Sequence, residues 1–261
     1  MERKIVFFDI DGTLLNDEKE IPESTKKAVH LLQEKGIYTV IATGRGPQMF
    51  EWIREELNIH SYVSINGQYV VFDGEVIYAN PMDPEMLADI TKLAAGQGHA
   101  VAYCSHEQVK VSEENHPFIQ ESFRNFLKLD HPPQDREYFK HTPIYQGHLF
   151  CQAHDEQIYA ERYPDYCFIR WHEYASDFLP RGCSKAAGIH KLLEAADIKQ
   201  ENSYAFGDAA NDVEMLALVG TGVAMGNAVP EAKAAADVIT TSSSEDGILH
   251  GLVKVGLLEN K

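Results

Sequence analysis

The chain has 261 residues, of which 44% are hydrophobic and 24% charged, as in an ordinary soluble globular protein. It carries 23 Lys and Arg against 40 Asp and Glu, a net charge of −17, and so acidic a surface argues against a nucleic-acid partner. No stretch approaches the ~20 apolar residues of a membrane span, and little room precedes the first apolar run for a signal peptide, so we expect no membrane partner and a cytoplasmic location.

The N-terminal part has the alternating strands and helices of a doubly wound α/β sheet. Residues 5–8, Ile-Val-Phe-Phe, predict a strand buried on both faces, as in a parallel sheet with helices on each side. A helix is expected to begin near Pro22 and to end at Gly36, and residues 37–42 predict the next buried strand. The elements that follow are a helix with apolar residues at 49–57, a strand at 62–65 and a hairpin over 68–78.

Strands and helices are again predicted to alternate near the C-terminal end. Ser184 is expected to cap a helix that runs to residue 196, and residues 204–206 predict a short strand closed by Gly207-Asp208. The further elements are helices at 212–218, 230–236 and 247–255 and strands at 222–225 and 238–239. Together the two ends of the chain predict one Rossmann-like core with a parallel sheet.

The middle of the chain breaks this pattern. It begins after Asn80-Pro81 and closes at 180–182, Pro-Arg-Gly, both of which are typical of loops. It contains one long amphipathic candidate helix over 118–127 and strand-like pieces at 148–152 and 166–171. We therefore expect an inserted α+β domain over residues 82–183, with 1–81 and 184–261 forming the α/β core.

Two carboxylates follow the first predicted strand. Asp9 and Asp11 stand at its end, and Gly12 lets the backbone turn away sharply. Ligand sites in open α/β sheets lie at the carboxyl ends of strands. Two anions this close repel each other unless a cation or a shared proton lies between them. With a divalent metal bound, Asp9 can coordinate it and attack an electrophile, while Asp11 can protonate a leaving alkoxide and later deprotonate water.

Three further segments place polar residues where a core strand ends or a core helix begins. Thr43 and the Gly44 amide would hydrogen-bond phosphoryl oxygens, and Lys185 would neutralise the nucleophile and the phosphate from a helix start. Asp208 adds an oxygen ligand for Mg²⁺, and Asp212, one helical turn further on, would steady that metal through water.

Two neighbouring polar residues have two interpretations each. Arg45 can contact a substrate group, or it can form a salt bridge at the start of a helix. Asn66 can bind substrate, or it can make hydrogen bonds within its loop. We include both among the candidate substrate-binding residues.

These segments, in this order, resemble the four motifs of the haloacid-dehalogenase superfamily of phosphotransferases. The matching segments are Asp9-Ile-Asp11-Gly-Thr13, Thr43-Gly-Arg45, Lys185 and Gly207-Asp208-x-x-Asn211-Asp212. The resemblance implies that Asp9 is the nucleophile and that Asp11 is the acid–base and also gives a backbone carbonyl to Mg²⁺. It further implies that Asp208 completes the protein ligands of the metal and that Asn211 contacts the phosphoryl group.

The place of the insertion between the second and third motifs, with Ser-Ile-Asn-Gly at 64–67, resembles the Cof-type (IIB) subfamily and its C2-type cap. The resemblance implies an Mg²⁺-dependent phosphohydrolase that removes phosphate from a small phosphorylated metabolite, a sugar phosphate or a cofactor phosphate, through an aspartyl-phosphate. A phosphomutase or phosphotransferase would use the same residues. A non-enzymatic phospho-aspartate module of the receiver type is the third alternative, which the position of Asp9 on the first strand and the inserted domain disfavour.

Overall fold

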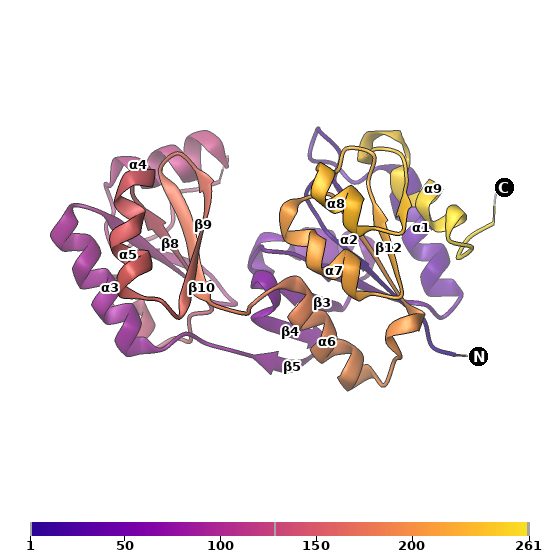
Figure 1. Cartoon of the computed structure of the whole chain (residues 1–261), viewed down its shortest axis with the longest axis horizontal. Coiled ribbons are helices and arrows are strands. Elements are labelled where there is room, and N and C mark those ends of the chain that lie inside the picture. The colour runs from indigo at the N-terminus through magenta and orange to yellow at the C-terminus, as the bar shows by residue number, and fades with distance from the viewer. Residues whose placement is uncertain (1, 128, 260–261) are drawn as a thin grey trace. The chain divides into compact units, whose positions relative to one another are not determined.

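The computed structural model describes residues 2–127 and 129–259, and Figure 1 labels its helices and strands. The chain forms two compact units. The core unit comprises Met1–Arg45, Met49–Ala79 and Ser184–Lys261, and the inserted unit comprises Gly46–Gln48 and Asn80–Cys183. The chain thus leaves the core unit after Ala79 and returns to it at Ser184. The function of the inserted unit as a cap stays a prediction.

The core unit is built on an eight-stranded sheet in the order β13-β12-β11-β1-β2-β3-β4-β5. At its centre, β1 (Ile5–Phe8) pairs in parallel with β2 (Tyr38–Ala42) and β11 (Ser203–Gly207). The parallel part continues with β3 (Ser61–Ser64), β12 (Thr221–Ala224) and β13 (Val238–Ile239). The predicted hairpin is present as β4 (Tyr69–Phe72) and β5 (Glu75–Ala79), which extend the sheet in antiparallel fashion.

Helices cover both faces of this sheet. Ile5 and Phe7 of β1 share a buried cluster with side chains of α6 (Lys185–Ala196), α7 (Val213–Leu218) and α8 (Pro230–Ala235). Phe206 faces the other way and lies against α9 (Gly247–Lys254), which packs on α1 (Glu23–Glu34) next to α2 (Glu51–Leu57). The predicted doubly wound α/β class is therefore confirmed.

The strand register brings the ends of the central strands to one edge. Phe8 of β1 lies opposite Ile41 of β2 and Phe206 of β11. The Asp9 amide continues the ladder by donating to the Phe206 carbonyl at 3.0 Å. The polar residues that follow these three strands consequently begin at the same edge of the sheet.

The inserted unit has a sheet of its own. Its five antiparallel strands run in the order β7-β6-β8-β10-β9. The strands are β6 (Ala100–Cys104), β7 (Val109–Val111), β8 (Gln146–Phe150), β9 (Tyr166–His172) and β10 (Ala175–Pro180). The helices are α3 (Pro84–Gln97), α4 (Pro117–Ile119), the π-helical η3 (Gln120–Phe126) and α5 (Glu156–Arg162).

Nowhere in residues 2–127 and 129–259 is a helix long and apolar enough to cross a membrane.

One prediction for the middle of the chain is wrong. The long helix there is α3, whereas the expected helix over 118–127 is a short α-turn followed by a π-helix. The boundaries of α3 carry ordinary helix start and stop signals. The Asp83 side chain accepts from the Glu85 amide, Pro84 stands in the first turn, and Gly98 ends the helix in the left-handed conformation.

Short 3-10 turns connect several of these elements. They are η1 (Pro47–Met49), η2 (Ile65–Gly67), η4 (Tyr138–Lys140), η5 (Ala153–Asp155), η6 (Gln200–Asn202), η7 (Ala210–Asp212) and η8 (Ser243–Glu245). Because η7 occupies 210–212, α7 begins at Val213 and not at residue 212 as predicted. In η2, Gly67 has φ +87° and touches the start of α6.

We expect Gly67→Ala to lower the free energy of unfolding by about 3 kcal/mol, because the new Cβ would stand 2.2 Å from the Ser184 carbonyl oxygen and 3.0 Å from the Gly188 nitrogen. Gly74→Ala is the matched control. Gly74 also has positive φ, at +83°, but a Cβ there meets nothing within 4 Å, so the loss should be about 1 kcal/mol. Urea titration measures both, and equal losses would contradict the close approach of η2 to α6.

Candidate active site

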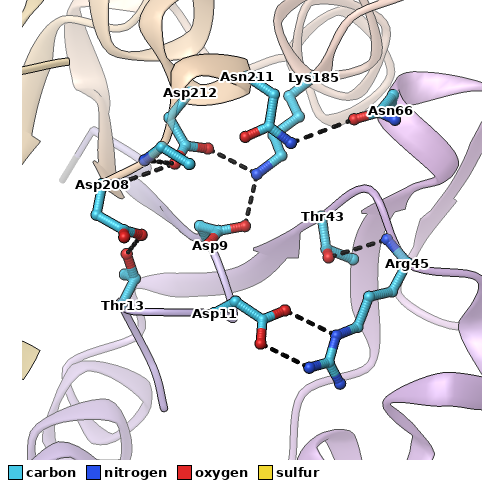
Figure 2. Close-up of polar contacts among 11 residues, drawn as sticks. Asp9, Asp11, Thr13, Thr43, Arg45, Asn66, Lys185, Asp208, Asn211 and Asp212 are labelled. Atoms are coloured by element: carbon cyan, nitrogen blue, oxygen red, sulfur yellow. Dashed lines mark hydrogen bonds and ion pairs between the residues drawn. The ribbon is translucent and has the colours of Figure 1, made fainter. Parts of the chain in front are cut away.

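A buried ion-pair network lies where β1 ends and α6 begins. Lys185 Nζ donates to Asp9 Oδ1 at 2.5 Å and to Asp212 Oδ1 at 2.6 Å, as Figure 2 shows. The exposed fractions of the Lys185, Asp9 and Asp212 side chains are 1%, 7% and 0%. The Ser184 hydroxyl caps α6 by accepting from the Ala187 amide, which places Lys185 in the first turn. One ammonium therefore joins the first strand to two later segments.

The charges in this network do not balance. Burial raises the pKa of Asp9 to about 8; the Lys185 ammonium opposes this shift and the Asp212 carboxylate adds to it. Burial lowers the pKa of Lys185, but the two carboxylates outweigh it and hold that pKa above its usual value. Burial also raises the pKa of Asp208 to about 6, against the hydrogen bond from Thr13. The site therefore has more carboxylates than cations, and a further positive charge would stabilise it.

The residues present fit a divalent metal. Asp9, Asp208 and Asp212 each offer a carboxylate oxygen, and these oxygens lie within 4.8 Å of one another. Oxygen is the ligand atom that Mg²⁺ and similar hard cations take. Asp212 already accepts from Lys185 with Oδ1 and from the Asp208 and Ala209 amides, each at 2.9 Å, with Oδ2. Asp9 and Asp208 are therefore better placed to bind a cation directly, and Asp212 to act through water.

Asp11 lies in a different environment from Asp9. Arg45 donates to both of its carboxylate oxygens, from Nε at 2.8 Å and from Nη2 at 2.7 Å (Figure 2). Lys19 Nζ also donates to Oδ1, at 3.0 Å. Burial raises the pKa of Asp11, but the bonds from Arg45 and Lys19 outweigh it and leave that pKa below its usual value. Of the two roles predicted for Arg45, the structure shows the salt bridge. Lys19 was missed from the sequence, since nothing there marks it.

The remaining predicted residues lie after β2, in η2 and in η7. Thr43 is buried after β2, and its hydroxyl accepts from the Arg45 amide at 3.1 Å. Gly44 packs so close to Asn66 that a Cβ there would be 3.1 Å from Asn66 Oδ1. Asn211 Nδ2 reaches the same Asn66 Oδ1 at 3.5 Å (Figure 2). The structure thus brings every predicted site residue to one edge of the core sheet, while their roles stay predictions.

The sequence interpretation missed one polar residue of this edge. Asn227 follows β12, and its Nδ2 donates to Gly12 O at 2.9 Å and to Asp208 Oδ2 at 3.2 Å. Thr13 donates to the opposite oxygen, Asp208 Oδ1, at 3.0 Å. The available signal was position, because Asn227 comes shortly after a strand that ends at the same edge of the sheet.

The chain belongs to the haloacid dehalogenase-like hydrolases. The model of that family matches residues 6–252, which is nearly the whole sequence. A Bacillus subtilis (strain 168) protein named "Putative phosphatase YkrA" is 44% identical over 259 residues, covering 99% of this chain and 100% of the relative. The prediction of a phosphatase of this superfamily is confirmed.

Solved structures have the same fold. A protein of Geobacillus kaustophilus HTA426 described as hypothetical is 48% identical and has a TM-score of 0.96, covering 98% of this chain and 100% of that one. The HAD subclass IIB sugar phosphatase BT4131 is 30% identical with a TM-score of 0.84, also covering 98% and 100%. The resemblance to subclass IIB is thereby confirmed.

Lys185→Met should lower the free energy of unfolding of the metal-free protein by about 3–5 kcal/mol above about pH 8, where Asp9 is ionised, because this buried carboxylate would be left without the cation that it shares with Asp212. The loss should shrink as the pH falls through the pKa of Asp9, since protonation removes the unpaired charge. Urea titration in EDTA at several pH values measures this. Lys199→Met, which removes an exposed lysine paired with Glu2 and Glu201, should leave the midpoint unchanged. Equal losses in the two variants would refute the structural role of Lys185.

Proposed function

We propose that the protein is an Mg²⁺-dependent phosphohydrolase that removes phosphate from a small phosphorylated metabolite through an aspartyl-phosphate on Asp9. The observation that carries the proposal is the Asp9 carboxylate, held by Lys185 at the carboxyl edge of the sheet beside Asp208 and Asp212. Similarity to the sugar phosphatase BT4131 supports a sugar phosphate as the substrate class, with a cofactor phosphate as the second possibility.

Asp9 is the nucleophile of the proposed reaction. Lys185 fixes one oxygen of its carboxylate and lowers the cost of bringing a phosphate dianion beside it. Attack on phosphorus forms the acyl-phosphate bond as the bond to the leaving oxygen breaks. Water then attacks the same phosphorus, which releases inorganic phosphate and restores the Asp9 carboxylate.

Asp11 moves the protons. In the first step it gives a proton to the leaving oxygen, and in the second it takes one from the attacking water. Arg45 and Lys19 stabilise its ionised form, which is the form that accepts the proton from water. Protonating the leaving group requires Asp11 to hold a proton against those two cations. A leaving group that needs no proton should therefore depend less on Asp11.

The phosphoryl group has its own set of donors. Thr43, the Gly44 amide and Asn211 bind its oxygens in this proposal, and Asn66 supports Asn211 through its side-chain carbonyl. Asp9 and Asp208 hold Mg²⁺ directly, with the Asp11 backbone carbonyl as a third protein ligand and Asp212 acting through water. When bound, this metal neutralises charge on the phosphate.

We assign the choice of leaving group to the inserted unit, as a C2-type cap over residues 82–183. The proposal rests on its position in the chain between the second and third motifs, and on the core site being occupied by residues suited to phosphate and metal. A lid of this kind excludes bulk water from the reaction and commits the substrate.

The protein should release phosphate from phosphorylated metabolites in the presence of Mg²⁺, and both EDTA and Asp9→Asn should abolish the release. Colorimetric phosphate assay across a panel of sugar phosphates, cofactor phosphates and p-nitrophenyl phosphate measures it. Asp197→Asn, at the C-terminal end of α6, is the matched control and should turn over like the wild type. Release by Asp9→Asn at a rate near that of the wild type would refute the nucleophile.

Asp11→Asn should lower kcat on an alkyl phosphate by roughly 10²–10⁴-fold, the range that general acid–base catalysis contributes, and should lower it less on p-nitrophenyl phosphate. The reason is that nitrophenolate leaves without a proton, whereas an alkoxide does not. Steady-state kinetics on a sugar phosphate and on p-nitrophenyl phosphate measures the two effects. Equal losses on both substrates would count against proton donation by Asp11.

A further inference from the structure

Asn227 joins three segments of the core unit through one side chain. Its Nδ2 group donates to Gly12 O at 2.9 Å and to Asp208 Oδ2 at 3.2 Å, and its Oδ1 accepts from the Ser243 amide at 3.0 Å. Both amide protons and the carbonyl oxygen are therefore used. Because acceptors face the nitrogen and a donor faces the oxygen, the orientation of the amide group is determined by its partners.

The backbone that carries Asn227 is anchored on both sides. The Gly226 amide donates to the Thr241 carbonyl at 2.9 Å, and the Val229 amide donates to the Asp208 carbonyl at 2.8 Å. The second of these bonds ties the loop after β12 to the same residue that the Asn227 side chain contacts. Asn227 thus approaches Asp208 from a fixed position.

Asp208 is held from two opposite sides. Thr13 donates to Oδ1 at 3.0 Å, and Asn227 donates to Oδ2 at 3.2 Å. Two donors on different oxygens fix the plane of a carboxylate, and each oxygen keeps lone-pair capacity for a cation. Packing leaves little freedom here, since a Cβ on Gly12 would stand 2.3 Å from Asp208 Oδ2 and 3.1 Å from Asn227 Nδ2.

We infer that Asn227 is a positioning residue that keeps the Asp208 carboxylate turned toward Asp9 and Asp212, so that a divalent cation meets ligands already in place. The inference rests on the proposed function, because it takes Asp208 as a ligand of the metal. Residues that orient a metal ligand from outside typically change metal affinity or activity by about 10–100-fold when removed. Asn227 acts through Asp208, so its removal should weaken metal binding and leave the chemical step at saturating metal nearly intact.

The test is isothermal titration of the metal-free protein with MgCl₂. Asn227→Ala should raise the dissociation constant for Mg²⁺ roughly tenfold, measured at a temperature where a cooperative thermal transition in EDTA shows that the variant is folded. The Mg²⁺ concentration that gives half-maximal phosphate release should rise by the same factor, while kcat at saturating Mg²⁺ stays close to that of the wild type. Thr13→Val, which removes the opposite donor, should also weaken Mg²⁺ binding.

Asn202→Ala is the matched control. Asn202 is another asparagine of the core unit, and its side chain donates to Glu2 at 3.5 Å. This variant should bind Mg²⁺ like the wild type. Equal Mg²⁺ affinity of Asn227→Ala and wild type would overturn the inference and leave the proposed phosphatase standing. A lowered kcat at saturating Mg²⁺ with unchanged affinity would overturn it as well. A wild type that binds no Mg²⁺ would overturn the metal proposal and the inference together.

Discussion

The site depends on one buried ammonium. Lys185 reaches Asp9, 176 residues away in the chain, and Asp212, 27 residues away. Removing such charges from water costs several kcal/mol each, so they persist only where the geometry of their partners is good. The Ser184 cap begins α6, and the close approach of Gly67, which follows β3, holds the first turn of that helix against the core unit. The position of Lys185 in the site therefore depends on how α6 packs against the core unit.

Asp9 and Asp11 are two positions apart in the chain and lie in opposite electrostatic surroundings. Asp9 is buried with a single cation and further carboxylates, and its pKa is raised. Asp11 is half-exposed between Arg45 and Lys19, and its pKa is lowered. Titratable pairs whose environments push their pKa values apart are a recurring basis for dividing chemical roles. In the proposed reaction a cation must therefore lower the pKa of Asp9 before its carboxylate can attack, and Asp11 must take up its proton against the charges of Arg45 and Lys19.

The sequence predicted the convergence of the polar segments at one edge of the sheet better than it predicted the helices of the inserted unit, for a physical reason. Asp9, Thr43 and Asp208 follow parallel strands, and parallel strands end at a shared edge, so their convergence could be inferred without knowing any side-chain contact. The contacts of Lys19 and Asn227 depend on how individual loops fold back, which no periodicity encodes.

In the inserted unit, the apolar residues of 118–127 suggested an α-helix, but the backbone widens into a π-helix over Gln120–Phe126. The change of period alters which side chains share a face, and composition alone does not report it. The helix α3 was not among the predicted elements, although Asp83 and Gly98 mark its two ends in the sequence.

The two ends of the inserted unit meet. A hydrogen bond with Asn80 bears on the Cys183 thiol, so the first and last residues of this long insertion are neighbours. Closing a flexible loop of about a hundred residues would cost the core roughly 4 kcal/mol of chain entropy. An insertion that folds on its own sheet removes that cost, because β5 and α6 are then separated by a short span of ordered chain. The core can therefore close around an insertion that is already ordered, although the insertion itself adds to the sequence separation of the strands that it divides.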